Sequence, residues 1–283
     1  MFRIFLFVLI FLSVYLCYGC HASPSTSDER IVALTPSLTS ALLALAPQAP
    51  LVATSQYTTW PESARTVATL PMPTPLERLV QLRPTLVLAH PSDVQLISKL
   101  ESLNIRVFAH AMDTLDDIYT TLETLSTLLD MPQNGSRAIL QLKTELDQIT
   151  ARYATSPTID ILFIIDVADA RMQHFYLAQN DAFLASLTQA CGGHTLHTDN
   201  TNWGRISAES LLRLNPYAIL FLSPNDAIGE ERRQTFSTLY AGLDAISAGR
   251  VFYLNGESYS TPDLRLPSTQ EAICKAIDTL RKR

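Results

Sequence analysis

One sequence motif occurs twice, at an offset of 132 residues, and this repetition constrains the fold more than any other feature. The two copies are Leu76–Leu88 and Ala208–Leu220, each with a short amphipathic segment led by a glutamate, a proline turn and an apolar run. At the same offset Ile31–Leu34 matches Phe163–Asp166, and both are strand-like. An amphipathic helix that leads into an apolar strand is typical of a buried parallel sheet. The sequence therefore predicts an α/β protein of two Rossmann-like lobes with parallel sheets and a ligand cleft between them.

A single long helix is predicted between the two halves, within the stretch from about Asn134 to Tyr153. Its apolar residues recur at helical spacing, the breakers Pro132 and Gly135 are expected to precede it, and Ser156–Pro157 is expected to end it. About 20 residues at 1.5 Å each span roughly 30 Å, which is enough for a rigid brace between two lobes. The expected organisation is a signal peptide (1–20), a tether (21–29), an N-terminal lobe (30–132), a connecting helix (133–156) and a C-terminal lobe (157–283).

Composition and motifs exclude several function classes. The chain of 283 residues is 47% hydrophobic and carries a net charge of −6, so it has no electrostatic attraction for nucleic acid. It has no Gly-x-Gly-x-x-Gly, Gly-x-x-x-x-Gly-Lys, His-Glu-x-x-His or Gly-x-Ser-x-Gly motif. We therefore expect a binding protein, with an exported enzyme on the same scaffold as the alternative.

The first 20 residues are a targeting segment. Arg3 precedes an apolar run from Ile4 to Leu16, and a small residue, Gly19, precedes Cys20. This resembles a bacterial lipoprotein signal with the lipid on Cys20, although Cys17 stands where an aliphatic residue is usual. An ordinary cleaved signal peptide and an uncleaved anchor are the alternatives. All three predict a location in the periplasm or at the outer face of the cytoplasmic membrane.

Two cysteines, Cys191 and Cys274, remain after the signal segment. In an exported chain they favour one disulfide that closes a long loop. The alternative is two separate buried thiols.

Four segments carry a resemblance to a known family: Val32–Thr39, Ser55–Pro61, Leu76–Pro84 and Ala190–Gly193. On these segments the chain resembles the ABC-importer substrate-binding proteins that carry cobalamin, iron-siderophores or haem, and whose two lobes are joined by one helix. The resemblance covers nearly all of residues 30–282 and is greatest to the cobalamin-binding branch. It implies a monomer without a cofactor of its own, which captures a corrinoid or ferric chelate and delivers it to permease and ATPase subunits.

The resemblance also implies roles for single residues. Trp203 matches a tryptophan of the cobalamin branch, and the positions of Cys191 and Cys274 match a disulfide of that branch. One departure is Leu70–Met72, where the cobalamin branch has a further pocket tryptophan. This departure favours another chelate relative to cobalamin.

Aromatic residues in irregular segments after strands are candidates for the ligand cleft: Tyr57, Trp60, Trp203 and Tyr259. Large flat ligands are held mainly by aromatic and apolar contacts, although each of these residues has core packing as the alternative. His90 directly follows a predicted strand and is a candidate axial ligand of cobalt or iron, with surface polarity as the alternative.

The second half also offers polar candidates for the site. Asp166, Gln179 and Arg265 are expected to contact polar groups of the ligand. His194 and His197 are three residues apart in a predicted strand, which places them on opposite faces, so a shared metal is not expected.

Glu77 and Glu209 occupy the same place in the two copies of the repeat. The resemblance implies that such a pair docks onto arginines of the permease, and paired carboxylates would fix the orientation by charge-assisted hydrogen bonds. The alternative is that each glutamate only complements a helix macrodipole.

Overall fold

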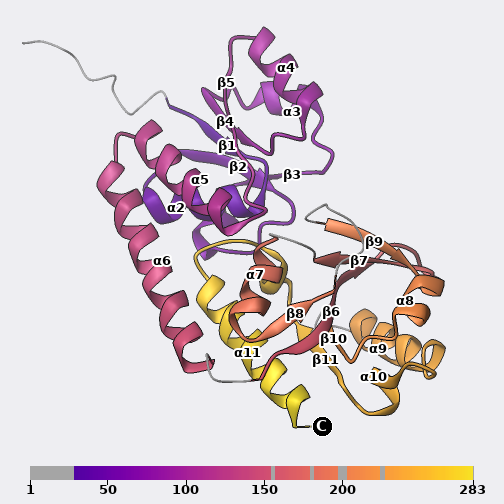
Figure 1. The fold of residues 1–283 in the computed structure, drawn as a ribbon. Helices are drawn as coiled ribbons and strands as arrows, with labels where there is room; N and C mark the ends of the chain where they lie inside the picture. Colours follow the sequence, from indigo (N-terminus) through magenta and orange to yellow (C-terminus); the bar gives the residue numbers. More distant parts are fainter. Residues whose placement is uncertain (1–28, 154–156, 179–181, 197–202, 224–226, 283) are drawn as a thin grey trace, which may run out of the picture.

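Two lobes, each built on its own sheet, make up the molecule in the computed structural model (Figure 1). The structure describes residues 29–153, 157–178, 182–196, 203–223 and 227–282. Cys20, Gln179 and His197, for which the sequence suggested roles, lie outside the described residues. No described helix is both long and apolar enough to cross a membrane.

The first lobe is a five-stranded parallel sheet in the order β3-β2-β1-β4-β5. Its strands are β1 (Ile31–Ala33), β2 (Leu51–Ser55), β3 (Ala68–Leu70), β4 (Leu86–Ala89) and β5 (Arg106–Ala109). Its helices are α2 (Pro36–Leu45), the 3₁₀ helix η1 (Glu62–Thr66), α3 (Leu76–Gln81), α4 (Val94–Ser102) and α5 (Leu115–Leu128). The segment 55–75, expected to be irregular, therefore contains η1 and β3.

Helices cover both faces of this first sheet. Ile31 and Ala33 of β1 pack in the core cluster that contains α2 and α5, whereas Val32 packs in the cluster that contains α3 and α4. Alternate residues of a strand point to opposite faces, so a strand buried on both faces must be apolar throughout. This explains the continuous apolar runs of the sequence.

The second lobe is a mixed sheet in the order β11-β10-β6-β7-β9, with β8 also paired to β6. Its strands are β6 (Ile159–Val167), β7 (His174–Ala178), β8 (Gly193–Thr195), β9 (Trp203–Ser207), β10 (Ala218–Ser223) and β11 (Val251–Asn255). Its helices are α7 (Phe183–Ala190), α8 (Ala208–Leu214), α9 (Ala227–Leu239), α10 (Asp244–Ser247), the 3₁₀ helix η2 (Glu257–Ser260) and α11 (Leu266–Arg281).

The prediction of two α/β lobes is confirmed, but the second sheet is not wholly parallel. β7 pairs antiparallel with both β6 and β9. Trp203 begins β9, so the prediction that it lies in a loop is wrong, and its side chain lies outside the described part of the chain. The physical reason is that β7 returns directly along β6, which needs no helical crossover.

The repeated motif forms the same unit in both lobes. The unit α3-β4 places β4 parallel to β1, and α8-β10 places β10 parallel to β6. The residue before each proline has a left-handed backbone, with φ of 47° at Arg83 and 39° at Asn215. Asparagine tolerates this conformation better than arginine does.

Replacing Arg83 with the residue of the other copy, Arg83→Asn, is expected to raise the free energy of unfolding by about 0.5–1 kcal/mol. The gain comes from a lower cost of the left-handed backbone at this helix end. Urea denaturation measures it. Arg78→Asn, in the body of α3, serves as the control and is expected to lower stability, because asparagine is a weaker helix former than arginine.

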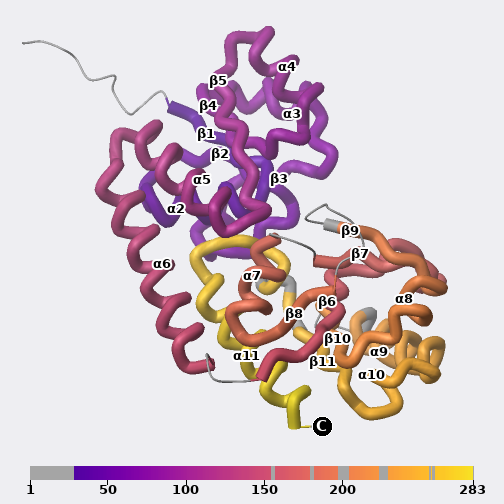
Figure 2. Tube along the Cα trace, viewed as in Figure 1, coloured from indigo at the N-terminus to yellow at the C-terminus, as the bar shows by residue number. Residues whose placement is uncertain are grey.

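Helix α6 (Pro132–Tyr153) runs along both lobes and is attached to each (Figure 2). It begins earlier than predicted and includes Gly135. A Cβ atom at Gly135 would lie 2.1 Å from Ser126 Oγ of α5, so glycine permits the close approach of these two helices. The Asn134 side chain also donates to the Leu45 carbonyl (2.8 Å).

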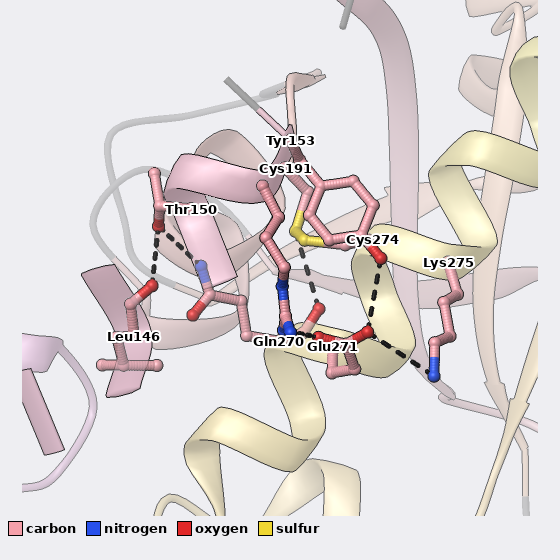
Figure 3. Close-up of polar contacts among 9 residues, drawn as sticks. Leu146, Thr150, Tyr153, Cys191, Gln270, Glu271, Cys274 and Lys275 are labelled. Atoms are coloured by element: carbon pink, nitrogen blue, oxygen red, sulfur yellow. Dashed lines mark hydrogen bonds and ion pairs between the residues drawn. A yellow bond between two sulfur atoms is a disulfide. The ribbon is translucent and has the colours of Figure 1, made fainter. Parts of the chain in front are cut away.

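The other end of α6 is fixed to α11 of the second lobe (Figure 3). Gln270 Nε2 donates to Thr150 Oγ1 (2.9 Å), and Tyr153 donates its hydroxyl to Glu271 (3.3 Å). Beside these contacts Cys191 and Cys274 form a disulfide, which decides between the two alternatives left open by the sequence. The largest core cluster contains Leu142, Leu146 and Ile149 of α6 together with residues of both lobes. Helix α6 therefore acts as a brace between them.

Candidate functional site

A hollow of about 130 Å³ lies between the lobes at the carboxyl ends of β1, β4 and β5. In the order β3-β2-β1-β4-β5 the connections leave β1 and β4 in opposite directions, and ligands bind at such a switch point in open α/β sheets. The hollow is lined by Thr35, Ser37, Leu38, His90, His110, Met112 and Asp113 of the first lobe and by Phe183, Ser260 and Pro262 of the second.

The two lobes are hydrogen-bonded to each other at this hollow. The Phe183 backbone N–H donates to the Asp113 carbonyl at 2.8 Å. The next residue, Thr114, forms an antiparallel bridge with Ala182. The residues on either side of the hollow are therefore held in register across the lobe boundary.

His90 is held in place by two neighbours. Its Nδ1 lies 2.6 Å from Ser92 Oγ, and its Nε2 lies 3.5 Å from the Asp113 carboxylate. The hydrogen bond with Asp113 raises the pKa of His90 above its usual 6.5, against the opposing effect of burial. The structure thus favours the protonated form of His90.

His110 lies beside His90 but has the opposite electrostatics. Ala89 and Ala109 are paired in adjacent parallel strands, so the histidine after each strand reaches the same edge of the sheet. His110 stacks on Phe108, with 4.2 Å between ring centroids, and burial lowers its pKa. A neutral imidazole can donate a lone pair to a metal.

Asp113→Asn is expected to lower the pKa of His90 toward 6.5, because the Asp113 hydrogen bond is the largest cause of the raised value. A raised folded-state pKa means that protonated His90 stabilises the fold below the unfolded-state pKa. That stabilisation is lost as the pH rises through the folded-state value. NMR titration of the His90 ring measures the shift. Asp93→Asn is the control, since Asp93 acts only as a weaker charge, and an equal effect of both variants would contradict the assignment.

The aromatic loop after β2 contacts the second lobe through Trp60. Arg265 lies over the Trp60 ring, 4.6 Å from its centroid, and its Nε donates to both carboxylate oxygens of the buried Asp263 (3.0 and 2.9 Å). Tyr57 is 62% exposed. Trp60 therefore lies at the lobe boundary, while Tyr57 projects into solvent.

A chain of buried hydroxyl groups anchors this loop. Thr58 Oγ1 lies 2.8 Å from Thr54 Oγ1, which lies 2.6 Å from Thr39 Oγ1 of α2. The hydrogen bonds satisfy three polar groups that would otherwise be costly to bury. They fix the segment that carries the two aromatic side chains.

Of the predicted ligand residues, His90 lines the hollow and Tyr259 does not. Tyr259 packs partly buried against the main core, but its neighbour Ser260 lines the hollow. Sequence reasoning missed His110 and Asp113. The signal was present for His110, which follows its strand just as His90 does. Among the described residues, no group of three or more His, Cys, Asp or Glu side chains is placed to hold a metal ion.

Comparison with known proteins assigns the family. Residues 31–257 match the family model described as periplasmic binding protein. The chain belongs to this family. The resemblance seen in the sequence is thereby confirmed, and the members of this family are binding proteins.

Individual relatives are distant but cover most of this periplasmic binding protein. A vitamin B12-binding protein of Vibrio campbellii is 23% identical over 270 residues, which cover 90% of this chain and 91% of the relative. The crystal structure of the periplasmic vitamin B12-binding protein of Vibrio cholerae has a TM-score of 0.75 at 21% identity, covering 90% and 98% of the two chains. A periplasmic heme-binding protein of Roseiflexus sp. RS-1 has a TM-score of 0.75 at 18% identity, covering 89% and 98%. These likenesses establish the two-lobe fold.

Proposed function

We propose that the protein is the substrate-binding component of an ABC importer and captures a metal-chelate cofactor, with cobalamin or another corrinoid as the first candidate. The observation that carries the proposal is the hollow lined by both lobes at the switch point of the first sheet. The vitamin B12-binding proteins among the relatives, matched over 90% of this chain, support the corrinoid.

The cleft offers the contacts that a large flat chelate needs. Trp60 supplies an aromatic ring at the lobe boundary, where Arg265 packs over it and is ion-paired with Asp263. Phe183 and Met112 give the hollow apolar walls. The hollow is smaller than the 300–1,000 Å³ usual for drug-sized ligands, so a corrin must extend beyond it along the boundary. Because α6 is attached to both lobes, we expect only a small opening.

A second candidate, haem or a ferric chelate, is favoured by His110. Burial lowers the pKa of His110, which favours the neutral imidazole, and His110 lines the hollow. It is therefore a better candidate axial ligand than His90, whose Nε2 faces Asp113. Replacement of His110 by Ala would lower the affinity for haem but leave that for a corrinoid with both axial positions filled nearly unchanged.

Transport roles complete the proposal. Glu77 and Glu209 dock onto the permease, and the loaded protein acts as a monomer outside the cytoplasm, anchored by a lipid on Cys20. Catalysis is no part of this role. Glu77 and Glu209 lie in the first turns of α3 and α8, where both side chains are exposed.

Titration of the purified protein with cyanocobalamin, cobinamide, ferric siderophores and haemin tests which chelate is bound. Intrinsic tryptophan fluorescence reports on Trp60 at the lobe boundary. We expect saturable quenching by a corrinoid at sub-micromolar concentration. A response to haemin or a ferric siderophore alone would replace the corrinoid by the second candidate, and a response to none would contradict the proposal.

A further inference from the structure

The repeated helices expose an aliphatic side chain next to each glutamate. Val80 is 38% exposed and follows Glu77 by three residues, and Leu212 is 49% exposed and follows Glu209 by three residues. Residues three apart in a helix lie on the same face, one turn on. On the opposite face the matching residues Leu79 and Leu211 are fully buried. We call Glu77 with Val80 the α3 patch and Glu209 with Leu212 the α8 patch.

Both patches lie on helices that face away from the brace. In Figure 1, α3 and α8 lie on the right of the molecule, one on each lobe, whereas α6 runs down the left. Each aliphatic residue is exposed at the same repeat position as its counterpart in the other lobe. The side of the molecule away from α6 therefore carries the same pair of chemical groups twice.

The two patches differ in charge. Arg213 lies 3.6 Å from Glu209 in the α8 patch, so that carboxylate is partly neutralised. The matching residue of α3 is Gln81, and within the described ranges Glu77 has no ion pair. The Glu77 carboxylate therefore lacks the ion pair that partly neutralises Glu209.

The two patches also differ in apolar surface. Leu212 is larger than Val80, and 49% of its surface is exposed, against 38% for Val80. The α8 patch therefore offers more apolar surface to a partner.

We infer that the two patches form one unequal docking surface, in which the α3 patch binds mainly through charge and the α8 patch mainly through apolar burial. The partner that fits is a membrane subunit present in two copies, each presenting a cationic side chain beside an apolar one. Because the pair of exposed groups occurs once in each lobe, it fits a partner that presents one complementary pair in each of its two copies. The inference rests on the proposed importer function and adds to it the aliphatic residues and the unequal shares.

Binding of the chelate-loaded protein to nanodiscs that hold the permease–ATPase complex of the producing organism tests this inference. We expect Glu77→Gln to weaken binding about tenfold and to reduce its salt dependence, and Glu209→Gln to weaken it about threefold. Leu212→Ser is expected to weaken binding about tenfold and Val80→Ser about threefold. Leu140→Ser is the matched control, because Leu140 is 68% exposed on α6.

The outcomes separate this inference from the proposed function. Equal losses for the two glutamate variants, or serine variants at Val80 and Leu212 that bind like Leu140→Ser, would overturn the inference while the wild type still binds its chelate and the nanodiscs. Failure of the wild type to bind any chelate, or to bind the nanodiscs when loaded, would overturn the importer function and the inference with it.

Discussion

Replacing both Glu77 and Glu209 with Ala is expected to reduce uptake about 30-fold and to leave ligand affinity unchanged. In the proposed docking each carboxylate supplies a charge-assisted contact to the permease, and the roughly tenfold and threefold losses expected for the single variants multiply. Both side chains are exposed and neither lines the interlobe hollow, so the fold and the cleft are expected to stay intact. Uptake of radiolabelled cyanocobalamin and calorimetric titration of the purified variant measure the two quantities.

The control for this double variant replaces two other exposed glutamates of the first lobe, Glu62 and Glu101, with Ala. This second double variant has the same change in net charge, so it is expected to keep normal uptake. Uptake by the Glu77→Ala/Glu209→Ala protein equal to that of the control would contradict the docking role.

Gly135→Ala is expected to lower the free energy of unfolding by about 1–3 kcal/mol, although alanine is the better helix former. The added Cβ would lie 2.1 Å from Ser126 Oγ and 2.7 Å from Ser126 Cβ, and real atoms do not approach so closely. Helices α5 and α6 must therefore separate, which loosens the attachment of the brace to the first lobe. Thermal unfolding measures the effect.

Two further variants test this explanation of Gly135. Gly242→Ala adds a Cβ that has no neighbour within 4 Å, so it is expected to change stability little. Ser126→Gly removes both clashing atoms and is expected to restore part of the stability of Gly135→Ala. If Gly135→Ala and Gly242→Ala were equally stable, the close approach of α5 and α6 would not require glycine.

The repeat made the fold predictable because its signals are local. In Leu76–Leu88 and in Ala208–Leu220 a helix, a proline turn and an apolar strand follow one another. In both copies the helix and the strand form where the sequence predicts them. The direction of β7 and the strand that begins at Trp203 depend on pairing between distant segments, which apolar periodicity does not encode. Gly135 was misread as a helix breaker because its role is set by a residue of another helix.

The candidate site could be predicted only on the side of the first lobe. His90 followed from its position after a strand, and the register of β4 and β5 explains why His110 joins it. Phe183, Ser260 and Pro262 complete the hollow from the second lobe. Their contribution depends on how α6 sets the two lobes against each other, and sequence patterns do not show this placement.

Calorimetric titration of three proteins with cyanocobalamin tests the central claim most directly. These are the wild type, Ser37→Trp, which fills the interlobe hollow, and Ser63→Trp, which adds the same ring at an exposed position of η1. The proposal predicts one sub-micromolar site in the wild type and in Ser63→Trp, and its loss in Ser37→Trp. Unchanged binding by Ser37→Trp, or no binding by the wild type, would contradict capture of a corrinoid between the lobes.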